Sequence, residues 1–205
     1  KQFKSSNRFN MKKYLLVFTF FLGLMGHSQD TTAVDASVAK PATNRIGEDW
    51  TIGTELDLLP YISGGYYVSL WYGKDHLRYR GVYARTNVPS FAVPDGFSNH
   101  ELWAAAFIVD YFFKENFEGW WVAAGYEYWD SQIQTESGSH KLFYNNNVMT
   151  VGGGYVWKFA DNFYLNPWAA GHILITGTGP FQMGDQTYTP SLFTPELSLK
   201  VGWHF

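Results

Sequence analysis

From Trp50 onward, hydrophobic and polar residues alternate in segments that are separated by turn-forming residues. The last segment shows this most clearly, since every second residue is apolar and those between are polar or glycine. Its apolar positions are Leu197, Leu199, Val201, Trp203 and Phe205. A period of two residues places successive side chains on opposite faces of a β-strand. This segment is therefore predicted to form a strand with one apolar and one polar face.

Eight strands are predicted in total. Seven follow from the alternation and the turn residues, and they cover 64–72, 76–87, 98–113, 120–133, 142–159, 162–176 and 192–205. Their connections are alternately short and long, which is typical of a sheet with turns on one side and loops on the other. An eighth strand is predicted over 51–59. The chain is expected to enter the barrel and to end on the side of the short turns, and this requires an even number of strands. The alternative is one bent strand over 51–72.

Charged residues fall mostly on one face of these strands. Trp103 and Phe107 share the apolar face of their strand, for example, while Asp110 lies on the opposite face. A Lys or Arg that faces lipid near the midplane costs about 2–4 kcal/mol, and only a closed sheet pairs every backbone group in hydrocarbon. Arg85 and Glu101 depart from the pattern, but near strand ends, where the cost is small. The fold class predicted is therefore all-β, an antiparallel up-and-down transmembrane β-barrel of eight strands.

Aromatic residues are unusually abundant, with 9 Trp, 14 Tyr and 17 Phe in 205 residues. Membrane barrels use such residues in two girdles at the membrane interfaces. The alternative is a soluble sandwich or lipocalin-like barrel with an aromatic core, whose outer face should be polar. The apolar outer face predicted above favours the membrane barrel.

The chain is predicted to consist of four parts. Residues 1–10 are polar, basic upstream sequence, and residues 11–29 have the charged start and short apolar run of a signal peptide, cleaved near Ser28-Gln29. Residues 30–49 are predicted to be a flexible periplasmic lead-in, and residues 50–205 the barrel. These parts together predict export to the bacterial outer membrane.

Charge and cysteine content exclude several kinds of partner. The net charge of −3 argues against nucleic acid, which favours a basic surface. The absence of Cys excludes disulfides, thiolate metal sites and a lipid-modified Cys anchor. No cofactor is expected.

Ionisable residues are predicted to line the interior. An eight-stranded barrel is only wide enough for side chains to fill it, so we expect a plugged lumen. Its candidate polar lining is Glu55, Asp57, His76, Arg78, Arg80, His100, Asp110, Glu127, Lys158, His172, Glu196 and Lys200. Because the first and last strands must be neighbours in a closed barrel, Glu55, Asp57, Glu196 and Lys200 are expected to form a cross-strand network. Paired structural charges are the favoured interpretation, and a polar relay or a solute pocket is the alternative.

The signal peptide, the eight strands and the segment 197–205 make the chain resemble small outer-membrane barrels of the OmpA/OmpX type, over residues 50–205. The resemblance implies that the C-terminal segment is read by the barrel-assembly machinery, through the apolar positions given above. It also implies contact with outer-membrane lipid and leaves room for an envelope protein partner. A peptidoglycan-binding domain of the OmpA type is not expected, because the sequence stops at the barrel.

Some small barrels are enzymes that act on lipid A, either deacylases or palmitoyltransferases, and they carry a Ser, a His and an acid. The weak candidates are Ser98, His100 and Asp110. The order of Ser98 and His100 is the reverse of the His-x-Ser-Asn arrangement of the deacylases. Two residues on one face of a strand lie about 7 Å apart, whereas a nucleophile and its base need about 3 Å. Catalysis is therefore not favoured.

Two other groups of polar residues could form a site. His76, His100 and His172 lack the spacing of a metal motif, so no metal is expected. The apolar loop 56–67 holds Asp57, Tyr61 and Ser63, which either close the outer mouth or contact a ligand, or simply form a packed turn. The packed turn is favoured.

These observations predict a non-enzymatic outer-membrane barrel with a structural or interaction role in the envelope. A lipid-modifying hydrolase or acyltransferase and a narrow small-solute porin are the alternatives.

Overall fold

The computed structural model describes residues 46, 47 and 49–205. The predicted upstream segment and signal peptide, and most of the predicted lead-in, lie outside the described residues.

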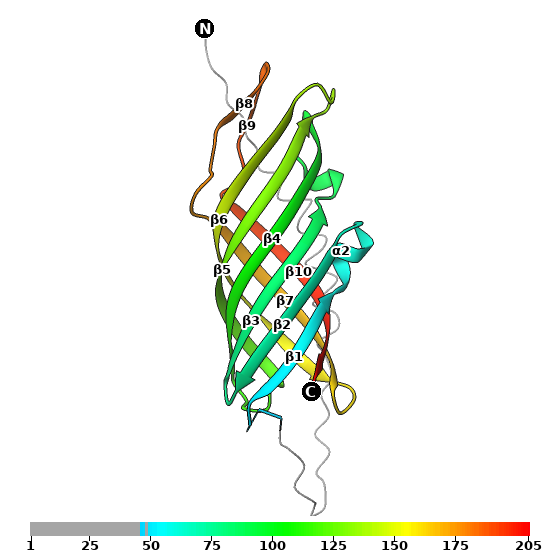
Figure 1. Ribbon diagram of the computed structural model, residues 1–205, viewed down its shortest axis with the longest axis vertical. Coiled ribbons are helices and arrows are strands. Elements are labelled where there is room, and N and C mark those ends of the chain that lie inside the picture. Colours follow the sequence, from blue (N-terminus) through cyan, green and yellow to red (C-terminus); the bar gives the residue numbers. More distant parts are fainter. Residues whose placement is uncertain (1–45, 48) are drawn as a thin grey trace, which may run out of the picture. The chain divides into compact units, whose positions relative to one another are not determined.

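Eight long strands close into one antiparallel barrel (Figure 1). They are β1 (Thr51–Asp57), β2 (Tyr66–Lys74), β3 (Leu77–Asn87), β4 (Phe97–Phe112), β5 (Gly119–Thr135), β6 (Lys141–Lys158), β7 (Phe163–Leu174) and β10 (Phe193–His204). Each strand pairs with its neighbour in sequence, and β10 pairs with both β7 and β1 to complete the ring. The predicted fold, a closed eight-stranded antiparallel barrel, is confirmed.

The connections at one end of the barrel are all short, at 75–76, 113–118 and 159–162, whereas three of the four at the other end are longer, at 58–65, 88–96 and 175–192. The longer loops carry a helical turn α2 (Leu58–Ile62), a 3₁₀ turn η1 (Ser90–Ala92) and a hairpin of β8 (Phe181–Met183) and β9 (Gln186–Tyr188). The hairpin was not predicted, because strands of three residues are too short to show a period. None of the helices in the described part of the chain is long and apolar enough to span a membrane.

The first strand ends earlier than predicted. It was expected to reach Leu59, but it stops at Asp57, whose carboxylate accepts a hydrogen bond from the Leu59 amide and so caps α2. The alternative of one bent strand over 51–72 is wrong, because β1 and β2 are separate strands paired antiparallel.

The outer surface of the barrel is apolar and its interior is polar. Phe107, Trp157 and Ile173 are each about half exposed, whereas Arg80 and Lys200 are fully buried. This is the alternation predicted for a membrane barrel, and it is the reverse of the polar outer face that a soluble barrel requires. The soluble alternative is therefore not supported.

Side chains fill the barrel along its length. A buried group near the short turns contains Trp71, Ile108, Phe112, Phe117, Trp121, Val156, Tyr164 and Trp168. Trp129, Val148 and Leu174 form a second group, and Ile133, Tyr144, Met183 and Tyr188 form a third near the long loops. The last group includes residues of both β8 and β9, so the hairpin packs against the inner side of the barrel mouth.

Glycines make room for some of the inward-facing rings. A Cβ added at Gly202 would lie 2.0 Å from Cζ of Tyr164, and one added at Gly53 would lie 2.4 Å from the Trp71 ring. Both glycines are on the strands that close the barrel, β1 and β10. Because glycine has no side chain, these two strands leave room for the Tyr164 and Trp71 rings.

Candidate functional site

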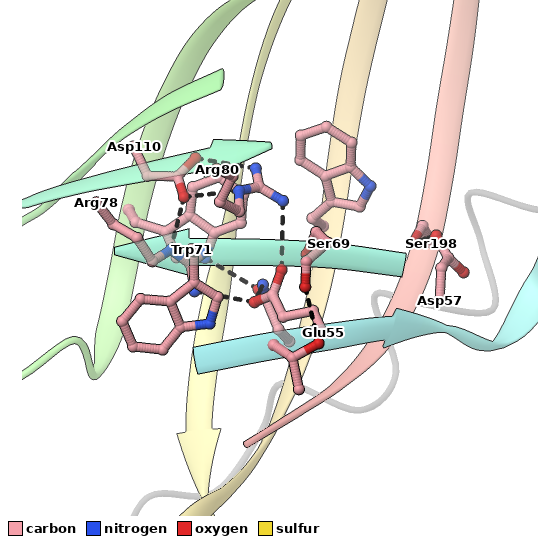
Figure 2. Close-up of polar contacts among 12 residues, drawn as sticks. Glu55, Asp57, Ser69, Trp71, Arg78, Arg80, Asp110 and Ser198 are labelled. Carbon is pink, nitrogen blue, oxygen red and sulfur yellow. Dashed lines mark hydrogen bonds and ion pairs between the residues drawn. The ribbon is translucent and has the colours of Figure 1, made fainter. Parts of the chain in front are cut away.

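Two arginines and two carboxylates form a closed ion cluster inside the barrel (Figure 2). Arg78 and Arg80 both point inward because they are two residues apart on β3. Arg78 donates to Asp110 Oδ2 from Nε at 2.6 Å and to Glu55 Oε1 from Nη1 at 2.9 Å. Arg80 donates to Asp110 Oδ1 from Nη2 at 2.9 Å and to Glu55 Oε2 from Nη1 at 3.3 Å. Each carboxylate therefore bridges both guanidinium groups.

Further hydrogen bonds fix the Glu55 carboxylate. Its Oε1 also accepts from the Tyr164 hydroxyl at 3.0 Å and from Asn166 Nδ2 at 2.9 Å. Trp71 Nε1 donates to the Tyr164 hydroxyl at 2.8 Å, and Trp121 Nε1 donates to Asn166 Oδ1 at 3.0 Å. The carboxylate is thus held by groups from β7 as well as β3.

Aromatic rings enclose the two arginines. Cζ of Arg78 lies 4.9 Å from the Phe112 ring centroid, and Cζ of Arg80 lies 5.2 Å from that of Trp121 and 5.3 Å from that of Trp168. Such contacts stabilise a cation that has lost its water. The four ionised groups carry no net charge together, and all are fully buried inside the barrel.

A second polar group surrounds His172. Thr150 donates its hydroxyl proton to Glu127 Oε1 at 2.6 Å, so its oxygen accepts from His172 Nδ1 at 2.8 Å. His172 Nε2 lies 2.8 Å from Glu196 Oε2, and Trp168 Nε1 donates to the other oxygen of Glu196 at 3.0 Å. All these bonds are satisfied together when both ring nitrogens of His172 carry a proton. The chain of contacts crosses from β5 to β10.

The expected network of Glu55, Asp57, Glu196 and Lys200 does not form as one unit. Glu55 belongs to the arginine cluster and Glu196 to the His172 group, while Asp57 accepts from Ser198. No described residue hydrogen-bonds to Lys200 Nζ. The prediction used only the β1–β10 pairing, whereas the hydrogen-bond partners of Glu55 lie on β3 and β7.

Lys200 is stabilised by an aromatic ring. Its Nζ lies 3.6 Å from the ring centroid of Trp168 and 5.1 Å from that of Tyr67. Lys200 is fully buried, so the cation–π contact with Trp168 replaces part of its lost hydration.

Two predicted lumen residues lie instead at the short-turn end. His76 is in the turn before β3, where its Nδ1 lies 2.8 Å from the Phe112 carbonyl oxygen and its ring stacks on the outward-facing Tyr111. Lys158 Nζ donates to the Asn116 carbonyl oxygen at 2.6 Å. Both residues lie at strand ends, where a residue on the inward face of the strand is not necessarily buried.

His100 lies at the opposite end, below the β8–β9 hairpin. Its Nε2 is 3.0 Å from the Tyr144 hydroxyl, which is 2.8 Å from the Tyr188 hydroxyl. Burial raises the pKa of the Tyr188 phenol above its ordinary value, and the neighbouring Tyr144 raises it further. Tyr188 therefore remains a neutral phenol and ties the hairpin to the barrel wall.

The three weak catalytic candidates do not meet. The Ser98 hydroxyl donates to the Thr135 carbonyl oxygen at 3.4 Å, and His100 contacts Tyr144. Asp110 is held by Arg78 and Arg80. A register shift lies between Ser98 and Glu101, which sequence alternation did not reveal. Among the described residues no group of three or more His, Cys, Asp or Glu is placed to hold a metal ion.

The three polar residues of the loop 56–67 have local hydrogen-bond partners. Asp57 caps α2, Tyr61 donates to the Tyr67 carbonyl oxygen at 3.1 Å, and Ser63 donates to the Pro60 carbonyl oxygen at 3.0 Å. This arrangement favours the packed turn over a ligand contact.

The predicted assembly signal lies on the outer face of β10. Ser198, Lys200, Gly202 and His204 are buried, so the five apolar positions between and beyond them face outward. Recognition of this face by the assembly machinery stays a prediction.

No family model and no curated protein matches the sequence. The structure is similar to the N-terminal β-barrel domain of Pseudomonas aeruginosa OprF, with a TM-score of 0.51 and 17% identity over 76% of this chain and 96% of that chain. The fold is that of a small outer-membrane β-barrel. Neisserial surface protein A also matches, with a TM-score of 0.48 and 14% identity over 76% of this chain and 97% of that one. At 17% identity the likeness to the OprF domain is one of fold.

Proposed function

We propose that this chain is an integral protein of the bacterial outer membrane, with a structural or interaction role in the envelope. The observation that carries the proposal is the reversed polarity of the barrel, apolar outside and ionic inside. A sheet can cross hydrocarbon only when it is closed and its outer face is apolar. The fold shared with the OprF barrel supports the same location.

The filled lumen supports a role other than solute passage. The ion cluster of Glu55, Arg78, Arg80 and Asp110 occupies one level, and the hairpin tied down by Tyr188 occupies the mouth. A solute would have to separate buried ion pairs, and each ion of such a pair depends on the opposite charge of its partner. The long loops are then the surface that would meet an envelope partner.

Biogenesis forms part of the proposal. Residues 11–29 would direct export and be removed near Ser28-Gln29. The outward face of Leu197, Leu199, Val201, Trp203 and Phe205 would then be read by the barrel-assembly machinery.

The test is expression of the chain in a Gram-negative host, followed by fractionation and planar-bilayer recording. We expect the protein in the outer-membrane fraction, resistant to extraction with alkaline carbonate. We also expect the purified barrel to show no stable unitary conductance. Recovery in the soluble periplasm would overturn the membrane assignment, and a steady conductance would favour the narrow-porin alternative. A change in lipid A mass in cells that express the chain would favour the lipid-modifying enzyme.

A further inference from the structure

The outer face of β2, β3 and β4 has a gap in its apolar surface at Gly81. These three strands lie side by side (Figure 1), and Gly81 on β3 pairs with Leu70 on β2 and Phe107 on β4. A Cβ added at Gly81 would meet no atom within 4 Å. Gly81 is therefore the floor of an open depression and is not a site of close packing.

The depression is a groove of about 560 Å³. Its walls are almost wholly apolar, and they include Val68, Leu70, Tyr83, Ala105, Phe107 and Tyr126. The small side chain of Ala105 makes one wall of the groove shallow, while aromatic side chains form its higher walls. The groove therefore has the volume and the apolar lining to receive a hydrocarbon chain.

An ion pair lies on the same outer face toward the long loops. Arg85 follows Gly81 by four residues on β3, a distance of about 13 Å along the strand. Arg85 Nη2 donates to Glu101 Oε2 at 2.7 Å, and each side chain is about a third exposed. Cζ of Arg85 lies 5.0 Å from the ring centroid of Trp103. Arg85 and Glu101 are also the two charges that depart from the alternation of the sequence.

Within residues 46, 47 and 49–205, the pair has a donor and an acceptor without a partner. Arg85 Nη1 takes part in no hydrogen bond or ion pair with any described residue, whereas Nε, which also has no partner among them, is buried. Glu101 Oε1 likewise takes part in no hydrogen bond or ion pair with any described residue. An ion pair with a free donor on one side and a free acceptor on the other is complementary to a zwitterion, which brings an anion to Arg85 and a cation to Glu101.

We propose that the groove at Gly81 and the Arg85–Glu101 pair together bind a membrane lipid with a phosphoethanolamine headgroup. One acyl chain lies over Gly81, the phosphate contacts Arg85, and the ammonium group contacts Glu101. Tyr66 and Tyr83, whose rings lie 5.9 and 6.0 Å from that of Trp103, flank the junction of headgroup and chain. The proposal rests on the proposed location of the barrel in a membrane.

The test is photolabelling of the refolded full chain in phosphatidylcholine vesicles. Three probes carry the same diazirine in one acyl chain and differ only in a phosphoethanolamine, phosphoglycerol or phosphocholine headgroup. Peptide mapping then locates the label. We expect the phosphoethanolamine probe to label the peptides of β3 and β4 around Gly81 severalfold more than those of β7, and more than either other probe does.

Variants separate the groove from the headgroup site. Gly81→Leu fills the groove and should abolish the local excess of label, whereas Ala169→Leu, on the outer face of β7 opposite β3 in the ring, should not. If Gly81→Leu fails to fold, Ala105→Leu fills the same groove from β4. Arg85→Gln and Glu101→Gln should each leave the groove labelled but remove the preference for phosphoethanolamine.

Uniform labelling of all outward-facing strands by every probe would overturn the lipid site while leaving the membrane assignment intact. Labelling at Gly81 without headgroup preference would overturn the role of the Arg85–Glu101 pair and with it the proposal. If no strand is labelled by any of the probes, the result would contradict the proposed function itself.

Discussion

Arg78 and Asp110 lie directly opposite each other on β3 and β4, and Arg78 Nε donates to Asp110 Oδ2 at 2.6 Å. Their contact follows from register, because both side chains point inward at the same level. Glu55 joins the pair from β1, so the cluster links the strand that begins the barrel to two strands in its wall. It stabilises a particular register as well as filling space.

Removing one carboxylate should destabilise the barrel strongly. Asp110→Asn leaves Arg78 and Arg80 with a single counter-charge in a fully buried site, and breaking a buried ion pair in this way costs about 3–5 kcal/mol. The measurement is reversible urea unfolding in lipid vesicles. Asp130→Asn is the matched control, since Asp130 is exposed on the outer face of β5, and it should change stability by less than about 1 kcal/mol. Equal effects of the two variants would mean that the cluster contributes little.

Removing the whole cluster should open the lumen. Replacement of Glu55, Arg78, Arg80 and Asp110 by Ala removes two charges of each sign, so the net charge is unchanged while space is created beside Trp121. We expect unitary conductance in planar bilayers where the unchanged protein shows none. If the variant folds and remains silent, the cluster is not the constriction, and the Tyr188 hairpin is the next element to test.

The hairpin should depend on Tyr188. Tyr188→Ala removes the hydroxyl bond to Tyr144 and a ring that is 4% exposed, so the hairpin should detach from the mouth. The measurement is the rate of proteinase K cleavage within 177–191 in intact vesicles. Thr187→Ala is the control, because Thr187 is exposed and bonds only within the hairpin. Equal cleavage rates would show that the hairpin is held by other contacts.

Period-two alternation and the turn residues predicted seven of the eight barrel strands and their faces, because the two faces of a strand meet different surroundings along its length. It could not predict partners across the lumen. Glu55 was expected beside Lys200 on the adjacent strand, yet its partners are on β3 and β7, and these depend on the stagger of the whole barrel. The register shift near Ser98 and the short hairpin at Tyr188 were missed for a related reason, since both interrupt the alternation on which the prediction depended.

Gly202 tests whether closure of the barrel depends on the fit of one ring. A Cβ at this position would lie 2.0 Å from Cζ of Tyr164, whose hydroxyl donates to Glu55. Gly202→Ala should therefore displace the ring and destabilise the barrel by about 1–3 kcal/mol, the usual cost of overpacking. Gly81→Ala is the matched control, because its added methyl meets no atom within 4 Å.

A double-mutant cycle identifies the cause. Tyr164→Leu removes the clashing atoms, so Gly202→Ala should cost much less in that background than in the unchanged chain. Urea unfolding of the four proteins in lipid vesicles measures the coupling. If the two effects simply add, the glycine is needed for the backbone of β10 and not for the ring, and the fit between Gly202 and Tyr164 does not control closure.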